Sequence, residues 1–328
     1  MSITHRLDNW FLGHERSLYR RQTLAGVATH KFKPGIGLTN LKAAALKKPE
    51  VMVKISKRTG KATGLKAAAN HIDYISRNGK LAVENQDGEQ IKGKAALREN
   101  VIKEWQRQGI PEQSKYKESL NVVLSMPPGT DPRAVKNAAR ELAQEVFKGH
   151  QYVFVQHLDE KHPHVHICVT MRNEMGKRMN LRKNDLFKWR VLFAEKMREH
   201  GVDCAATRRQ HRGVTQKGVN GTVGHITKRG VYSTVRQKEV NELLEAIKTQ
   251  KRPTHPYLKE QLETRRLILG EYRFLAKRLY DEGLKVEAKM VSELAKGLEQ
   301  ADVRTKGQEK FDKYQVKQSL EPASLNLG

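Results

Sequence analysis

Three histidines in the middle of the chain have the spacing of metal ligands on a β-hairpin. His157 ends one apolar run, and His164 and His166 begin the next, with a short turn around Glu160-Lys161 between them. Alternate residues of a strand share a face, so His164 and His166 point the same way. A turn centred on Glu160-Lys161 places His157 directly opposite His164, with Cβ atoms about 5 Å apart. The three imidazoles can therefore converge on one ion.

The residue types favour a catalytic metal site over a structural one. Three neutral imidazoles leave a divalent ion its full charge for polarising a bound oxyanion, and they leave coordination positions open. Asp159 follows His157 by two residues, and we expect its carboxylate to orient one of the histidines. His162, which precedes Pro163 in the turn, is expected to shape the turn and to stay outside the ligand set. The alternative interpretation is a polar sheet face with solvated histidines.

A tyrosine on a predicted helix is the candidate nucleophile. Residues 65–78 carry apolar side chains at three- and four-residue spacing, and Gly79 is expected to end this helix. Tyr74 lies off the apolar stripe, beside His71 and Arg77. A phenol has a pKa of about 10, far below that of a sugar hydroxyl, so a phosphotyrosine can be attacked again by a DNA 3′-OH. The alternative is an exposed tyrosine that packs on a neighbour or stacks on a base.

The elements that would position these groups are short strands and amphipathic helices. The apolar patterns predict strands over 51–55, 119–126, 152–157 and 164–171. Helices are predicted over 65–78, 94–107, 133–147 and 184–200. Asp131 followed by Pro132 is a typical helix start. Residues 119–171 therefore follow the order β-α-β-β and end in a hairpin, which indicates the α+β class.

The chain divides into five segments on composition. We expect residues 1–50 to form a basic N-terminal arm with one or two short helices and no core of its own, followed by a folded domain over 51–215. A basic Gly-rich linker is expected over 216–234, a helical C-terminal region over 235–318 and a tail over 319–328. The C-terminal helices are highly charged and break at Pro253-Thr-His-Pro256. They either pack on the folded domain, dock a partner, or form a structural extension.

The charge balance indicates a polyanionic partner. The 328 residues include 62 Lys and Arg against 36 Asp and Glu, a formal net charge of +26. This excess disfavours an ordinary metabolic enzyme and favours nucleic acid first, with an anionic membrane second. The sequence has no apolar run of membrane-spanning length and no secretory signal, so no membrane insertion is expected. Two cysteines provide no disulfide framework, which is typical of a cytoplasmic setting.

Basic residues near the candidate site are expected to contact DNA phosphates. Such contacts supply affinity and position without sequence information. The residues that we expect to bind DNA are Lys57, Arg58, Lys61, Arg77, Arg208, Arg209 and Arg212. The alternative for any one of them is a solvated surface position.

Taken together, these motifs resemble the relaxases, the mobilisation nucleases of conjugative plasmids and integrative elements. This family belongs to the His-hydrophobic-His superfamily of single-strand DNA endonucleases. The resemblance covers about 51–215 and has three parts: the segment from His71 to Gly79, the histidine motif from His157 to His166, and a basic segment over 184–213.

The resemblance implies a fold and a reaction. The fold is a central antiparallel sheet with helices on one side and a divalent metal, Mg²⁺ or Mn²⁺, on the other. Tyr74 would attack a phosphate at an origin of transfer and stay bound to the 5′ end. His157, His164 and His166 would bind the metal, and Asp159 would assist. The partners would be single-stranded and supercoiled DNA, a type IV secretion coupling protein and accessory DNA-binding proteins, in a bacterial cytoplasm, with possible export alongside the DNA.

The sequence departs from the family pattern in two places. About 50 basic residues precede the first strand, and they contain Tyr19, a rival nucleophile that lacks the helix context. Many members have Asn four residues after the second histidine of the pair, where this chain has Thr170. The general base is left open among His71, Asp73 and Asp159.

Other functions remain open from the sequence. A rolling-circle replication initiator or a transposase of the same superfamily is one, although in those the histidines usually precede the tyrosine. A basic DNA-binding scaffold with structural histidines is another, and a zinc hydrolase of small molecules fits the histidines but not the charge.

Overall fold

A computed structural model describes residues 2–14, 17–18, 32–56, 62–182, 184–214, 224, 226–227, 229–231 and 233–320. The chain forms two compact units. Unit 1 comprises residues 1–207 and 278–290, and unit 2 comprises residues 208–277 and 291–328. The histidine hairpin and the tyrosine helix both lie in unit 1.

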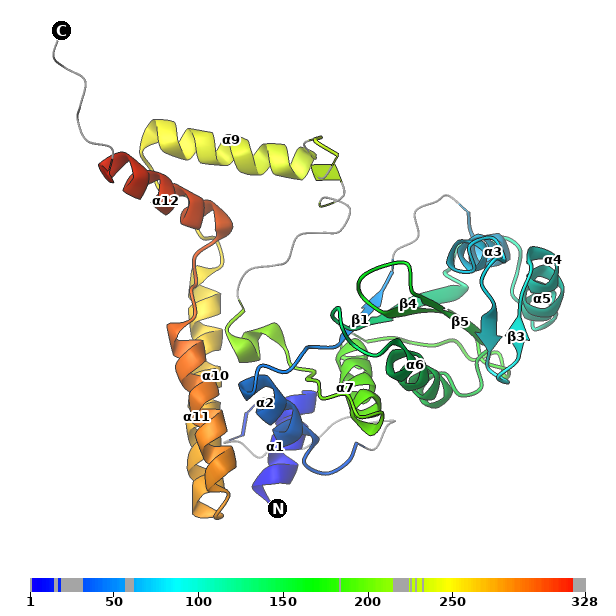
Figure 1. Ribbon diagram of the computed structural model, residues 1–328, viewed down its shortest axis with the longest axis horizontal. Helices are drawn as coiled ribbons and strands as arrows, with labels where there is room; N and C mark the ends of the chain where they lie inside the picture. Colours follow the sequence, from blue (N-terminus) through cyan, green and yellow to red (C-terminus); the bar gives the residue numbers. More distant parts are fainter. Residues whose placement is uncertain are drawn as a thin grey trace, which may run out of the picture. The chain divides into compact units, whose positions relative to one another are not determined.

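The centre of unit 1 is a six-stranded antiparallel sheet in the order β1-β4-β6-β5-β2-β3 (Figure 1). The strands are β1 (Met52–Ile55), β2 (Val83–Asn85), β3 (Gln90–Ile91), β4 (Ser119–Ser125), β5 (Tyr152–His157) and β6 (His164–Thr170). The sequence patterns found four of these strands and missed β2 and β3. Those two are only three and two residues long, and Glu84, Asn85 and Gln90 give them no apolar run.

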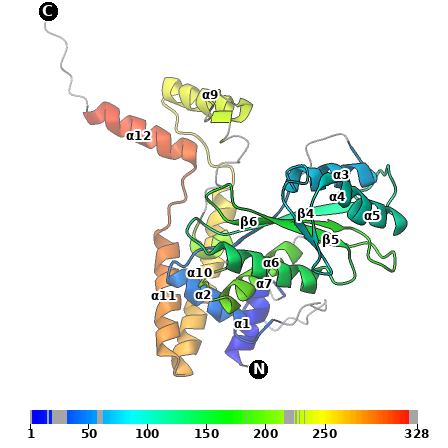
Figure 2. The ribbon, with the colours of Figure 1, turned by 45° about the vertical axis from the view of Figure 1, so that its right-hand side comes forward.

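One face of the sheet is covered by α6 (Pro132–Val146) and α7 (Asp185–Glu199) (Figure 2). Val165, Ile167 and Val169 point to this face from β6, and all three are buried. The α6 helix starts where the sequence predicts, because the Asp131 side chain accepts a hydrogen bond from the Arg133 N–H at 3.0 Å. This face is therefore a closed core that holds the hairpin in place.

The opposite face, which carries the histidines, is covered over part of its width. Two helical segments cover the side near β5. One is α3 (Gly64–Ile75). The other is continuous and consists of α4 (Lys94–Leu97), a π-helical turn η1 (Arg98–Ile102) and α5 (Lys103–Arg107). Their buried residues pack on Val153, Val155 and Cys168. The family resemblance implied helices on one side only, whereas here helices also cover part of the face that carries the histidines. The part over β1 and β4 forms the floor of a pocket.

The apolar spacing of α3 gives the helix one buried side. Leu65, Ala68, Ala69, Ile72 and Ile75 are all buried, as the three- and four-residue spacing predicts. Their burial leaves the opposite side of the helix free to face the pocket.

The first fifty residues contain two helices in the described ranges, α1 (Ile3–Leu12) and α2 (Ile36–Ala45). They pack on each other, and the Asp8 carboxylate accepts hydrogen bonds from the N–H groups of Gly35 and Gly37 at 2.7 and 2.8 Å. Leu7 and Phe11 are completely buried. Part of the predicted arm is therefore folded structure within unit 1.

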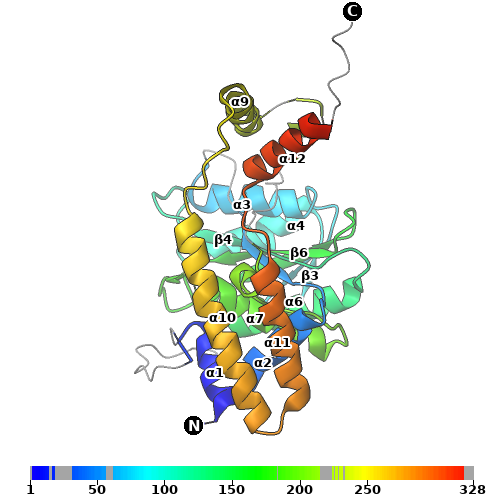
Figure 3. The same ribbon diagram turned by 90° about the vertical axis from the view of Figure 1, so that its left-hand side faces the viewer.

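Unit 2 contains most of the C-terminal helices. A short 3₁₀ helix, η2 (Arg209–Arg212), precedes α9 (Thr234–Thr249), α10 (Leu258–Asp281), α11 (Lys285–Gln300) and α12 (Lys306–Leu320). Helices α10 and α11 run alongside each other in opposite directions (Figure 3), and α9 contacts α12. The break between α9 and α10 includes Pro253 and Pro256, as the sequence predicts. Among the described residues, no helix combines the length and apolar character that crossing a bilayer requires.

Candidate metal centre and nucleophile

The hairpin register brings the three predicted histidines together. His157 pairs directly with His164, and His166 lies opposite Val155. The ring centroids of His157 and His166 are 4.6 Å apart. The ring centroid of His164 lies 5.2 Å from that of His157 and 5.1 Å from that of His166. One nitrogen of each ring lies within 4.8 Å of one nitrogen of each of the others. The cluster has the size of a single metal site.

Backbone carbonyls fix the orientation of two of these rings. Nε2 of His157 lies 2.7 Å from the carbonyl oxygen of Ile75, and Nδ1 of His164 lies 2.8 Å from that of His162. A carbonyl oxygen can only accept, so each of these nitrogens donates its proton. Nδ1 of His157 and Nε2 of His164 therefore carry the lone pairs, and that of His157 accepts a 3.4 Å hydrogen bond from Arg77 that a metal would replace. His162 stays outside the cluster and supplies a main-chain anchor, as its place in the turn suggests.

Burial favours the neutral form of two of these histidines, His157 and His166. Burial lowers the pKa of His166 to about 3, with further lowering from His157, His164, His71 and Lys54. Burial also lowers the pKa of His157. Nδ1 of His166 is buried and has no hydrogen-bond partner among the described residues. Neutral imidazoles with available lone pairs are the form that binds metals, so the residues present fit a divalent ion.

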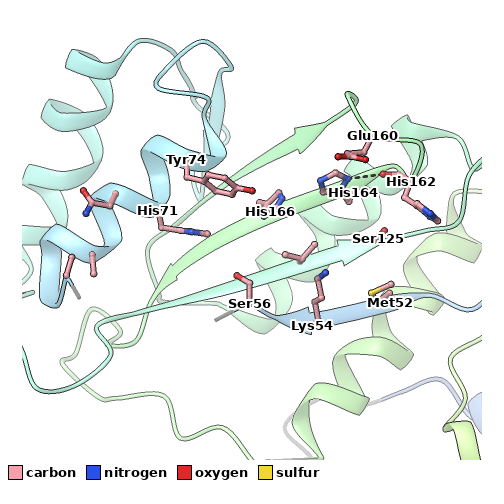
Figure 4. Close-up of a pocket in the computed structure, with 14 residues that line it drawn as sticks. Met52, Lys54, Ser56, His71, Tyr74, Ser125, Glu160, His162, His164 and His166 are labelled. Carbon is pink, nitrogen blue, oxygen red and sulfur yellow. Dashed lines mark hydrogen bonds between the residues drawn. The ribbon is translucent and has the colours of Figure 1, made fainter. Parts of the chain in front are cut away.

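Tyr74 faces the histidines from the neighbouring helix. Its ring lies edge-on to the ring of His166 at 6.4 Å and stacks beside His71 at 6.1 Å. The guanidinium of Arg77 lies 5.7 Å from the Tyr74 ring centroid. Tyr74 is 59% exposed, and its hydroxyl points towards His164 and His166 (Figure 4). The helix thus presents a phenol to the metal cluster.

A pocket of about 730 Å³ lies between the tyrosine and the open part of the sheet. Its lining residues come from β1, β4, β6, α3 and the hairpin turn, and they include Met52, Lys54, Ser56, Asn70, His71, Tyr74, Val123, Ser125, Glu160, His162, His164 and His166 (Figure 4). Lys54 was missed by the sequence analysis. Strand alternation puts Lys54 on the same face as Met52, but only the pairing of β1 with β4 shows that this face lines the pocket.

The turn after α3 holds the helix end against the sheet. Arg77 and Asn78 have φ angles of +54° and +57°, in the left-handed region, and Gly79 follows at +82°. A Cβ at Gly79 would lie 2.4 Å from the backbone nitrogen of Lys94, so only glycine fits this approach. The prediction that Gly79 ends the helix is wrong: α3 ends at Ile75 and the left-handed turn begins at Arg77. Gly79 instead allows the close approach of this turn to the segment at 93–94.

Asp159 accepts a hydrogen bond from Arg77 at 2.6 Å. The same Arg77 nitrogen lies 3.4 Å from Nδ1 of His157. From the sequence we expected Asp159 to orient a histidine, and in the structure Arg77 connects Asp159 with His157. Of the other candidate bases, Asp73 is paired with Arg98 and Lys94, whereas His71 lines the pocket beside Tyr74.

The expected DNA contacts fall in different places. Arg77 lies at the metal cluster. Arg208, Arg209 and Arg212 belong to unit 2, in and next to η2, and Arg209 is exposed. Lys57, Arg58, Lys61 and the rival Tyr19 lie outside the described residues.

Comparison with known proteins shows which nucleases this chain is similar to. Residues 74–202 match the MobA/VirD2-like relaxase nuclease domain. The T-DNA border endonuclease VirD2 of Agrobacterium fabrum is 28% identical over 190 residues, which cover 51% of this chain and 42% of that protein. The proteins of the same name from Rhizobium radiobacter and Rhizobium rhizogenes are each 27% identical, over 51% of this chain and 44% and 43% of their own lengths.

The chain spans less than half the length of these curated relatives. No solved structure matches it. The match begins at Tyr74 and includes the whole histidine hairpin, so it covers both halves of the site. Over residues 74–202 the chain is therefore similar to relaxase nuclease domains of the MobA/VirD2-like type.

Proposed function

We propose that this protein nicks one strand of DNA at an origin of transfer and becomes covalently attached to the new 5′ end through Tyr74, which initiates conjugative DNA transfer. The observation that carries the proposal is a cluster of three imidazoles with the size of one metal site, and the phenol of Tyr74 beside His166 in the adjoining pocket. A relaxase domain and relatives named as border endonucleases support the same reaction class.

Each residue would have a defined part in the reaction. The phenolic oxygen of Tyr74 forms a bond to phosphorus, the bond from phosphorus to the 3′-oxygen breaks, and the phenolic proton leaves to a base. His157, His164 and His166 would hold a divalent ion, Mg²⁺ or Mn²⁺, whose charge polarises the scissile phosphate when bound. His71 is the candidate base that lies in the pocket beside the phenol.

The pocket suits a single strand of DNA. Its floor combines the apolar Val123 and Met52 with the cationic Lys54, and the chain as a whole carries a net charge of +26. Grooves that bind single strands combine positive charge with apolar or aromatic surfaces. We place the nuclease domain at 51–215, and we propose that a secretion coupling protein and accessory DNA-binding proteins act with it in the bacterial cytoplasm.

The test is formation of a covalent protein–DNA conjugate. The full chain is incubated with Mn²⁺ and a labelled single-stranded oligonucleotide that contains the origin sequence of the element encoding the protein, and the products are separated under denaturing conditions. We expect a labelled conjugate with the native chain and with Tyr116→Phe, which changes another exposed tyrosine. Tyr74→Phe should bind the oligonucleotide but form no conjugate.

Two results would overturn the proposal. A conjugate formed by Tyr74→Phe would show that another residue is the nucleophile. Cleavage without any conjugate in the native protein would indicate direct hydrolysis by water, which is a different reaction.

A further inference from the structure

We propose that Asp159 acts on the metal site through Arg77, by neutralising a guanidinium that would otherwise repel the metal ion. The inference rests on the proposed metal site and assigns a role to two residues outside its ligand set. It concerns affinity for the ion and is independent of how the nick is made.

Arg77 occupies a position that connects the tyrosine helix with the histidine hairpin. Its Nη2 donates to Asp159 at 2.6 Å and lies 3.4 Å from Nδ1 of His157. Its guanidinium carbon lies 5.7 Å from the ring centroid of Tyr74. Contacts with three groups of the site offset the strain of a left-handed backbone, at φ +54°, in this residue.

The contact with His157 has an electrostatic cost. Nε2 of His157 donates to Ile75, so Nδ1, which accepts the hydrogen bond from Arg77, carries the lone pair that a metal would need. The guanidinium is permanently charged, so a divalent ion on Nδ1 would lie close to a second cation. The repulsion between them would weaken binding of the ion.

Asp159 removes most of this repulsion. Its carboxylate is in hydrogen-bond contact with the guanidinium, so an approaching ion meets a pair of nearly zero net charge. The Arg77 and Asp159 side chains are 35% and 57% exposed, so solvent screens part of the effect. The pair still keeps Arg77 beside Tyr74 and His157 at little electrostatic cost to the metal.

This arrangement predicts effects of opposite sign for the two residues. Asp159→Asn leaves the guanidinium charged and unneutralised, so affinity for Mn²⁺ should fall about tenfold, the scale seen for residues that support metal ligands. Arg77→Gln removes the repelling charge, so affinity should stay equal or increase. The double variant Arg77→Gln/Asp159→Asn lacks both charges and should recover the native affinity.

The experiment is titration calorimetry of the full chain with Mn²⁺ in the absence of DNA. Asp203→Asn is the matched control, because Asp203 is an exposed acid of unit 1 that is paired with Lys48 away from the site. Thermal unfolding of each variant establishes that it is folded. Recovery in the double variant is a result that a purely structural role for Asp159 would not produce.

Three outcomes separate the ideas under test. Unchanged affinity in Asp159→Asn, or a double variant as weak as Asp159→Asn alone, overturns the role of Asp159 through Arg77 and leaves the proposed function intact. No Mn²⁺ binding by the native chain would overturn the metal site itself, and the inference with it.

Discussion

His157 and Ile75 are 82 residues apart in sequence, and Nε2 of His157 donates a 2.7 Å hydrogen bond to the Ile75 carbonyl oxygen. Ile75 directly follows Tyr74 and is the last residue of α3. This hydrogen bond fixes the tautomer of a proposed metal ligand and helps to hold α3, which carries the proposed nucleophile, against the histidine strands. The metal site and the phenol are therefore positioned as one unit.

This double role can be separated by substitution. His157→Gln keeps an N–H donor for the Ile75 carbonyl but loses the imidazole, so Mn²⁺ affinity should fall by about 100-fold with little loss of stability. His157→Ala also leaves the buried carbonyl without its donor, which should lower the free energy of unfolding by a further 1–3 kcal/mol or so. Calorimetry and urea unfolding measure the two effects. Equal stability of the two variants would contradict the role of the hydrogen bond.

Gly79 should be much less tolerant of substitution than a glycine with similar backbone angles elsewhere. Gly79→Ala places a Cβ 2.4 Å from the Lys94 nitrogen, whereas a Cβ at Gly88, which has φ +83°, would meet no atom within 4 Å. Gly88→Ala should cost about 1–2 kcal/mol from the left-handed backbone alone. Gly79→Ala should cost about 1–3 kcal/mol more because the backbones must separate. Urea unfolding of both variants is the measurement, and similar losses would show that the contact can relax.

DNA affinity should depend steeply on salt, and Lys54 should account for part of this dependence. For single strands, each phosphate neutralised contributes about 0.7 to the slope of log K against log salt concentration. Lys54→Ala should reduce the slope by about that amount, because Lys54 lies on the pocket floor. Arg107→Ala is the control, since Arg107 is paired with Glu104 outside the pocket lining. Fluorescence anisotropy over a salt series gives the slopes, and a flat series would rule out electrostatic binding.

His211 should make unit 2 less stable in mild acid. Its pKa is lowered to about 3, mainly by burial and further by Arg208 and Arg212, whereas an unfolded histidine titrates at about 6.5. Below pH 6.5 or so the unfolded chain therefore binds a proton that the native chain does not, and stability falls as the pH falls. The loss should reach up to about 2 kcal/mol near pH 5. Urea unfolding across this range should show a shallower decline in His211→Gln, and an identical decline would contradict the assignment.

The sequence was most informative where side chains alternate or repeat at regular spacing. The hairpin register, with His157 opposite His164, follows from strand alternation and one turn, and the structure confirms it. The buried stripe of α3 and the Asp131 cap of α6 follow from local patterns in the same way. These features depend on residues close together in the chain, so one sequence is enough to predict them.

Features that depend on distant segments were not predictable in this way. The short strand β2 has Glu84 buried against Arg140 of α6, so its polar sequence is typical of a loop until the tertiary ion pair is known. The bridge from Asp159 to His157 depends on the left-handed conformation of Arg77, which no local pattern indicates. Lys54 becomes a pocket residue only through the pairing of β1 with β4.

The separation in sequence between the tyrosine helix and the histidine hairpin also has a consequence for reversibility. The phenol and the imidazoles belong to elements that are joined only in the folded chain, so unfolding separates Tyr74 from the ion that would activate the reverse reaction. A DNA strand attached to Tyr74 would then remain attached throughout any passage in which the protein is unravelled. On the proposed mechanism, release would then require the chain to refold.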